Sequence, residues 1–488
     1  MKRVLTIVVL AMGAANLAAQ GDAVLSGLSW VPHQLETLPH RRPVGTGFLS
    51  LPEVNAVWAT NWLQPAQWLE TNAEGTTLNL NAFVNELHDG NQLSVEGRVN
   101  WLGFGWAMGD SKRHFISGSA VEVVRASLTL PGDVLRLPFL GNLHASSVAG
   151  ESLAAQLDHY RRFSFGWQAQ WTPRWSSGVR LHHLRGFEHA ELRDAELNWS
   201  TDEEDFSWEF SGAAAVQTAG LALLMDSMDG NTALERGASA YLKEAGSPGW
   251  GVDVGVAFCP NEHWVVESSF TGFGGISWNR EVWNARWEAD PTAFDGVELG
   301  AWALDATALE DSASAQLAQW TEWADAALAA EESAEPFQST LPGLWLGQIQ
   351  RRFPNGHSAQ FAMRHSAPFG TTCSAGATAS LGRFMQWNST YTHGRGVRAL
   401  GVGFAMRFGG LLLHTTVDNV LAARVAQVEW GDARSIWLPL DASRLHVRAG
   451  LSWVLGRPRK PLPERRAAPS TRHPGAASIK AVSCPDFQ

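Results

Sequence analysis

The stretch Arg162–Trp171, which reads RFSFGWQAQW, decides the fold class of this chain. Apolar residues alternate in it with polar or small ones: Phe163, Phe165, Trp167, Ala169 and Trp171 against Arg162, Ser164, Gly166, Gln168 and Gln170. Alternation at period two is typical of a β-strand whose two faces meet different surroundings. The pattern recurs at 250–258, 399–408 and 445–455, with a shorter copy at 206–210. The sequence therefore predicts an all-β protein.

Further candidate strands lie near 48–61, 92–108, 113–127, 177–188, 263–278, 343–351, 357–365 and 410–418. Turn-forming residues separate the candidates, at Gly109–Asp110, Ser176–Gly178, Pro260–Asn261, Pro354–Gly356 and Gly409–Gly410. We expect about 14 strands in all.

Two architectures could carry this pattern. A soluble sandwich would hide the apolar face between two sheets, whereas a transmembrane barrel would turn it toward lipid and keep polar residues in the lumen. Several alternating stretches approach the roughly 9 to 11 residues of a tilted spanning strand, while soluble strands usually stop near about five or six. Because a sheet can span a bilayer only when it closes on itself, we expect a transmembrane antiparallel β-barrel.

Tryptophans near the ends of the expected strands fit the aromatic girdles of such a barrel, although each could equally be a core residue: Trp101, Trp106, Trp171, Trp175, Trp264, Trp278 and Trp453. The whole chain has 24 Trp against 3 Tyr, and only 17% of its 488 residues are charged. An apolar content of 45% excludes disorder over the whole chain. The net charge of −11 argues against a nucleic-acid partner, because phosphate contacts need a basic surface.

The amino terminus indicates export. Lys2 and Arg3 precede an apolar run from Val4 to Ala11, and small residues follow up to Ala19. This arrangement predicts a signal peptide over residues 1–20. The barrel is then expected over 21–456, and the basic, Pro-rich segment 457–488 is expected to be a disordered tail. The three cysteines, Cys259, Cys373 and Cys484, give no disulfide framework, although a Cys259–Cys373 bridge is possible.

Short helices are expected near 78–87, 131–141 and 302–330. The last lies in an acidic insert, 287–350, which holds twelve Asp and Glu residues and no Lys or Arg. Apolar residues recur there every three or four positions, as in an amphipathic helix with an acidic outer face. A cation-binding or gating loop is the alternative, but the spacing matches no known calcium loop.

The order of these segments also resembles a known family. The matching features are Val31–Gln34 after the signal peptide, Leu51–Pro52 opening the first strand, Leu78–Leu87, Leu130–Asp133 with Leu137–Asn142, His159–Arg161, Phe294–Val297 and Val417–Leu421. Together they resemble uncharacterised outer-membrane β-barrels of Bacteroidota, which are distantly similar to FadL-type long-chain fatty-acid transporters. The resemblance implies the cell outer membrane as location and lipid as the surrounding partner.

The chain departs from this family at Leu38–Arg42, where family members tend to carry Asn-Pro-Ala. The departure weakens any claim that the amino-terminal segment plugs the barrel as in better-known relatives. A second departure is the tail after Gly456, because such barrels usually finish on an aromatic residue of the last strand.

The function implied by the resemblance is passive transport of a hydrophobic or amphipathic small molecule. A structural or secretion-accessory barrel without cargo and a barrel-embedded enzyme stay open as alternatives. No catalytic motif was found, and His182 and His183 point to opposite faces of one strand, so they cannot share a metal even with His189 nearby. Asp253 and Glu209 are expected on the lumen wall. We therefore predict a non-enzyme without catalytic, cofactor-binding or metal-ligating residues.

Overall fold

The computed structural model describes residues 23–43, 45–62, 65–72, 75–88, 90–109, 112–140, 147–149, 153–201, 208–221, 246–294, 330–354, 356–366, 370–394, 397–420, 425–430, 434–439 and 444–456. The predicted signal peptide and the tail 457–488 lie outside these residues, and so does nearly all of the helix expected at 302–330. Ala330 itself begins a strand. No helix in the described part of the chain is long and apolar enough to cross a membrane.

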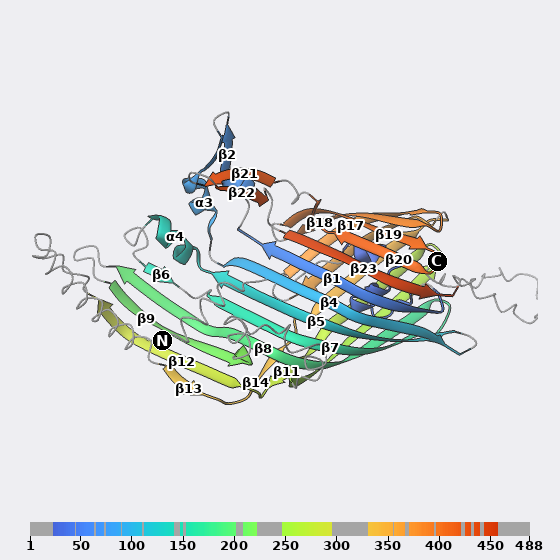
Figure 1. The fold of residues 1–488 in the computed structure, drawn as a ribbon, viewed down its shortest axis with the longest axis horizontal. Coiled ribbons are helices and arrows are strands. Elements are labelled where there is room, and N and C mark those ends of the chain that lie inside the picture. The colour runs from blue at the N-terminus through green and yellow to red at the C-terminus, as the bar shows by residue number, and fades with distance from the viewer. Residues whose placement is uncertain are drawn as a thin grey trace, which may run out of the picture.

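Within the described residues, 14 strands form a closed antiparallel barrel (Figure 1). In order around the barrel they are β1 (Gly47–Thr60), β4 (Asn91–Met108), β5 (His114–Leu130), β7 (Ala154–Gln170), β8 (Trp175–Thr201), β10 (Ser247–Asn261), β11 (Trp264–Trp278), β15 (Leu344–Arg352), β16 (Ser358–Ser366), β17 (Gly370–Leu381), β18 (Met385–Gly394), β19 (Val397–Phe408), β20 (Leu411–Val417) and β23 (Arg444–Leu455). The first and last strands pair from Gly47↔Leu455 to Ala59↔Arg444, which closes the wall. Both the fold class and the strand number predicted from the sequence are confirmed.

The faces of the strands are as the alternation predicts. On β7, Phe165 and Trp167 are exposed on the outside, whereas Ser164 and Gln168 are buried in the interior. On β10, Val254 is 42% exposed and its neighbour Asp253 only 1%. The apolar faces therefore line the exterior and the polar faces line the lumen, which excludes the sandwich alternative.

The two ends of the barrel differ. Within the described chain, one end carries short turns, such as Trp171–Trp175 and Gly409–Gly410, and we call it the short-turn end. Five exposed tryptophans lie near that end: Trp106, Trp171, Trp175, Trp264 and Trp453. These side chains and that of Trp101 are exposed, as a girdle requires, but Trp278 is fully buried and belongs to the core.

The opposite, long-loop end carries a sheet that extends the wall (Figure 1). The outer half of β8 pairs with β9 (Trp208–Ala219), which pairs with β12 (Val282–Phe294) and through it with β13 (Ala330–Ser333). Two short strands join at its edges, β6 (Ser147–Ala149) on β8 and β14 (Phe337–Thr340) on β11. Of the stretch 206–210, expected as a barrel strand, the described residues 208–210 belong to β9 in this extension, and 206–207 lie outside the described residues. Glu209 is accordingly exposed and does not line the lumen.

Further described helices and hairpins also lie at the long-loop end. They are α2 (Pro65–Trp68), the hairpin of β2 (Leu69–Asn72) and β3 (Gly75–Leu78), α3 (Leu80–Glu86), α4 (Gly132–Leu140), and the hairpin of β21 (Val425–Trp430) and β22 (Arg434–Pro439). The helices expected near 78–87 and 131–141 are thus confirmed. Asn79 caps α3 by accepting a hydrogen bond from the Ala82 amide, and Phe83 of α3 packs edge-on against Phe139 of α4.

Candidate functional site: the plugged lumen

The described chain begins inside the barrel. Every residue from Ala23 to Arg41 except Ser29 is buried, and this segment, called the plug below, crosses the lumen near the short-turn end (Figure 1). The plug contains two short 3-10 helices, η1 (Leu25–Gly27) and η2 (Pro32–Glu36). The segment thus fills the lumen despite the departure from the family pattern at Leu38–Arg42. The residues present at the departure themselves contact the wall, among them Leu38, His40 and Arg41.

Apolar side chains of the plug fit three separate sockets in the wall. Leu25, Leu28, Trp30 and Val31 pack with Ala405, Leu412 and Val454, Leu35 packs with Phe48 and Phe115, and Leu38 packs with Leu346 and Ala362. Wall side chains also bind the plug backbone, which forms few helical hydrogen bonds of its own. The side chains of Gln360, Thr378 and Ser269 donate hydrogen bonds to the backbone carbonyls of Ala23, Gly27 and Thr37, respectively. The plug is therefore held at many points around the barrel.

The strongest polar anchor of the plug is at its carboxyl end. Arg41 makes two charge-assisted hydrogen bonds to Glu267 of β11, from Nε to Oε1 at 2.8 Å and from Nη2 to Oε2 at 2.6 Å. His40 Nε2 lies 3.1 Å from the same Oε1. A third contact, from Arg41 Nη1 to the Ser26 carbonyl, ties the two ends of the plug together.

A second anchor is the carboxylate of Glu36, in the middle of the plug. It faces three wall arginines, with N–O separations of 3.8 Å to Arg162, 3.8 Å to Arg448 and 3.9 Å to Arg98. Burial raises the pKa of Glu36, but the neighbouring guanidinium groups outweigh burial and leave this pKa below its usual value. The plug thus supplies the negative charge that this basic part of the wall requires.

Two wall glycines let the plug approach closely. A Cβ on Gly178 of β8 would collide with the Pro39 carbonyl oxygen, and a Cβ on Gly255 of β10 would collide with the His40 ring. Ser176–Gly178 was expected as a turn, but these residues lie inside β8. A glycine is required at position 178 because the plug backbone lies against it. The neighbouring turn is formed by the residues just before Trp175.

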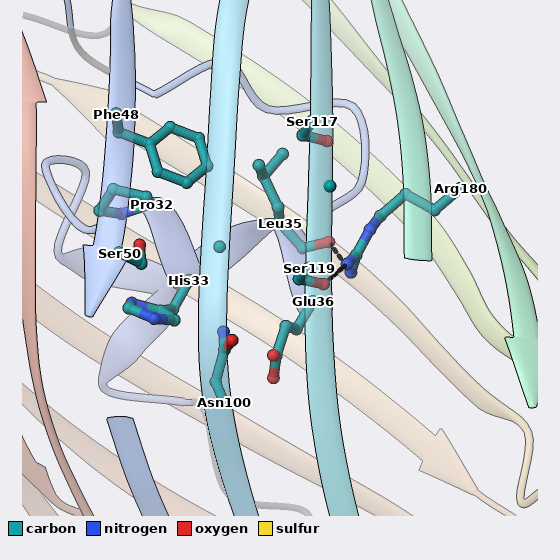
Figure 2. A pocket seen from close by; sticks show the side chains of 12 residues that line it. Pro32, His33, Leu35, Glu36, Phe48, Ser50, Asn100, Ser117, Ser119 and Arg180 are labelled. Atoms are coloured by element: carbon teal, nitrogen blue, oxygen red, sulfur yellow. Dashed lines mark hydrogen bonds between the residues drawn. The ribbon is translucent and has the colours of Figure 1, made fainter. Parts of the chain in front are cut away.

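A cavity separates the plug from another part of the wall (Figure 2). It is small, with a volume of about 20 Å³, and lies between η2 and small residues of β1, β4 and β5, among them Ser50, Ser117 and Ser119. Arg180 closes one side by donating to the Leu35 carbonyl and to Ser119 Oγ, both at 3.0 Å. Beside this cavity the plug still packs against β1 and β5, because Leu35 contacts Phe48 and Phe115.

The lumen beyond the plug holds an apolar cluster. Trp278 lies at its centre, and its members come from the wall and from the extension: Val121, Val123, Tyr160, Leu184, Ala219 and Ile276. His189 stacks on Trp278 at 4.9 Å between ring centroids and contacts Asp158 at 2.8 Å. The lumen is therefore not a water-filled pore along its whole length.

A groove on the exterior lies directly across the wall from the plug. It crosses β8, β10 and β11, with Trp167, Phe270 and Trp345 as its walls and the small residues Ser177 and Gly255 in its floor. This outer groove has a volume of about 440 Å³ and is open to the outside. Since Gly178 and Gly255 also border the groove, only backbone separates it from Pro39 and His40.

The histidines considered from the sequence lie where the alternation places them. His182 is buried in the lumen, while His183 packs on Trp250 outside. His182 Nε2 contacts Asp253 at 2.7 Å and its Nδ1 is hydrogen-bonded to Ser164 Oγ at 2.9 Å. This row resembles a nucleophile–base–acid arrangement, but the Ser164 side chain is buried and Asp253 also accepts from the Gly272 amide at a strand bulge. The row is best explained as a structural anchor of that bulge.

Comparison with known proteins places the chain in a family. Residues 42–418 match the model of a family of unknown function, DUF5723. Because the match covers most of the chain, the protein belongs to this family. A search of the curated proteins finds no match.

Among solved structures, the chain is similar to bacterial barrels. The Ralstonia pickettii toluene transporter TbuX is 8% identical over 88% of this chain and 94% of its own, with a TM-score of 0.38. The Pseudomonas putida toluene transporter TodX is 8% identical over 90% of this chain and 94% of its own, with a TM-score of 0.36. A Pseudomonas aeruginosa FadL homologue is 9% identical over 90% of this chain and 97% of its own, with a TM-score of 0.39.

Proposed function

We propose that this protein is a gated passive transporter of the outer membrane for small hydrophobic or amphipathic molecules. The observation that carries the proposal is the plug, a segment of the chain itself that closes the lumen through separate, non-covalent contacts. A closed barrel with an exposed apolar exterior and an even number of strands has the properties of an outer-membrane protein. In such barrels the short turns face the periplasm, so the plug would lie on the periplasmic side.

The contacts of the plug suit a gate. Its apolar sockets are small, and the pairs Arg41–Glu267 and Glu36–arginine can be exchanged for contacts with water when the segment moves. The cavity beside η2 holds only about 20 Å³, too little to receive the plug, so opening requires that these contacts break. Release of the plug from these contacts is the gating step that we propose.

Two apolar features support a hydrophobic cargo. The outer groove presents Trp167, Phe270 and Trp345 to the membrane, where a hydrophobic molecule is already concentrated. The Trp278 cluster offers a second apolar region in the lumen on the far side of the plug. A strongly charged cargo would find no such surface at either place.

Uptake by whole cells tests this function. The full chain is expressed in a Gram-negative host that lacks its own channels for hydrophobic compounds, and entry of radiolabelled toluene and oleate is compared with entry of a polar sugar. We expect faster entry of at least one hydrophobic probe than in cells with an empty vector, and no change for the sugar. Equal rates for all probes in both strains would contradict the proposal.

A structural barrel without cargo is the second candidate. The observation that favours it is the filled lumen, since the plug and the Trp278 cluster together leave little open space among the described residues. The same uptake experiment separates the two candidates, because a structural barrel would leave the rate of every probe unchanged.

A further inference from the structure

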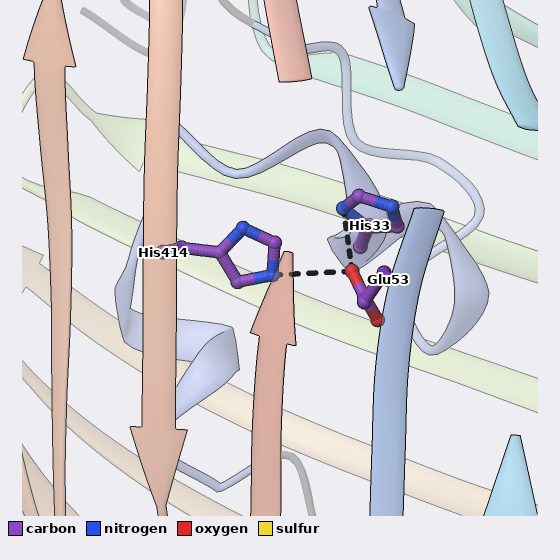
Figure 3. Close-up of side chains that lie close together, drawn as sticks. All are labelled: His33, Glu53 and His414. Atoms are coloured by element: carbon purple, nitrogen blue, oxygen red, sulfur yellow. Dashed lines mark hydrogen bonds and ion pairs between the residues drawn. The ribbon is translucent and has the colours of Figure 1, made fainter. Parts of the chain in front are cut away.

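Three side chains that commonly bind metals meet in the lumen (Figure 3). His33 comes from η2 of the plug, Glu53 from β1 and His414 from β20, and each is at most 3% exposed. One ligand atom from each residue lies within 4.8 Å of the others. Two imidazoles and one carboxylate form a donor set that Zn²⁺ uses in proteins, with a fourth position left for water. Sequence reasoning missed this set because its members are far apart in the chain.

The three side chains converge on one atom, Glu53 Oε2. It lies 2.7 Å from His33 Nδ1 and 3.1 Å from His414 Nε2. The contact with His414 is a hydrogen bond, whereas that with His33 lacks hydrogen-bond geometry. Bonds of about 2.0 to 2.2 Å from zinc to nitrogen and oxygen place tetrahedral ligand atoms about 3.3 to 3.5 Å apart. Small outward movements of the two rings therefore admit an ion between the three atoms.

The backbone leaves space for this convergence at Gly450. This glycine of β23 is the register partner of both Glu53 on one side and His414 on the other. A Cβ at position 450 would lie 2.6 Å from His414 Cε1 and 2.9 Å from Glu53 Cβ. The register of β1 also shifts between Ser50 and Glu53, and irregularities of this kind often re-aim a side chain at a functional site.

Arg448 orients the carboxylate from behind. Its Nε lies 3.3 Å from Glu53 Oε1, which leaves Oε2 for the two histidines. The charge of Arg448 is balanced in turn by Glu36, 3.8 Å away. Partners that fix a ligand in this way are a regular feature of metal sites.

We propose that His33, Glu53 and His414 bind one divalent transition-metal ion, Zn²⁺ in preference to Mg²⁺ or Ca²⁺, and that this ion fixes the plug to β1 and β20. The preference follows from the two nitrogen ligands, because Mg²⁺ and Ca²⁺ favour sites made of oxygen. The site goes beyond the proposed transport function, and metal binding is measured without any transport assay.

Titration of the full chain with zinc tests the site. The protein is refolded in detergent, stripped with EDTA, dialysed, and titrated with ZnCl₂ in a calorimeter. We expect one ion per chain, and at least about 100-fold weaker binding in His33→Ala, His414→Ala and Glu53→Gln, since loss of an outer partner alone costs about 10- to 100-fold. Co²⁺ should give the visible absorption of a four-coordinate ion in the native chain and lose it in each variant.

His182→Ala is the matched control, because His182 is also a buried lumen histidine beside a carboxylate, Asp253. It should bind zinc as the native chain does. Gel mobility before and after boiling verifies that each variant is folded, and the near-isosteric Glu53→Gln keeps the test valid if a histidine variant does not fold. Absence of stoichiometric zinc binding by the native chain, or equal affinity in folded Glu53→Gln, would overturn the proposal.

Discussion

Single lumen residues decide how firmly the plug is held. The alternation on β11 places Glu267 on the polar face, but the sequence does not indicate that its partner is Arg41, which lies 226 positions away. Likewise, His33 and His414 become neighbours only once the plug and the register of β23 are known. The face of a strand on which a side chain lies is a local property and could be predicted from the alternation. Which side chains meet across the lumen depends on the closed barrel and could not be predicted.

Glu267→Gln should loosen the plug. The substitution leaves the Arg41 guanidinium buried without its carboxylate, and breaking a buried ion pair typically costs about 3 to 5 kcal/mol. Hydrogen–deuterium exchange of residues 23–41 should rise in this variant, while exchange in β16–β19 stays unchanged. Asp158→Asn is the control, because Asp158 pairs with Arg125 and His189 away from the plug. Unchanged exchange of the plug in Glu267→Gln would show that this pair does not hold it.

Gly178→Val should displace the plug by collision. The new side chain would meet the Pro39 carbonyl, whereas the same change at Gly97 of β4 has no heavy atom within 4 Å of the added Cβ. We expect faster exchange of the plug in Gly178→Val and native exchange in Gly97→Val. Equal behaviour of the two variants would contradict the close approach at Gly178.

Acid should also weaken plug docking through Glu36. The pKa of this carboxyl is lower in the folded protein than its usual 4.5, so its stabilising effect is present above that pH. The effect is lost as the pH falls through the folded pKa and the carboxyl is protonated. Exchange of residues 23–41, corrected for the intrinsic rate, should therefore rise below about pH 4.5. Glu36→Gln should remove this component of the pH dependence, and an identical profile in both proteins would exclude Glu36 as its source.

At the scale of elements, the sequence predicts strands wherever bulky residues alternate with small or polar ones. Two barrel strands, β17 and β18, were not among the candidates. The outward face of β17 carries Thr371, Cys373 and Ala375, and that of β18 includes Ser389, so neither shows a continuous apolar period. The possible Cys259–Cys373 bridge is excluded, because Cys373 is a free cysteine.

The facing of β10 gives a prediction about stability. Val254 is exposed on the apolar exterior at the middle of the strand. Val254→Arg should therefore destabilise the barrel in a bilayer by roughly 2 to 4 kcal/mol, the cost of a charge near the midplane. Urea unfolding in phospholipid vesicles measures the change, with Thr172→Arg in an exposed turn as control. Equal stability of the two variants would count against the lipid-facing assignment.

At the scale of the whole molecule, closure could be predicted but the filling of the lumen could not. Strand length and alternation required a wall without a free edge, because unpaired backbone groups are too costly in a bilayer. The plug carries no such periodic signal. The plug contains only two short 3-10 helices, and contacts with the barrel wall stabilise it. Its position is therefore seen only in the folded barrel.

A spin-label scan along β18 tests most directly whether the apolar face meets lipid while the plug fills the lumen. Single labels are placed at positions 387–392 of the full chain in phospholipid vesicles, and collisions with oxygen and with a water-soluble nickel complex are measured. Labels at Trp387, Ser389 and Tyr391 should be reached by oxygen and not by nickel. Labels at Asn388, Thr390 and Thr392 should be shielded from both, because these side chains are buried in the interior. Free access of nickel to the second set, or no alternation between the sets, would contradict the plugged membrane barrel.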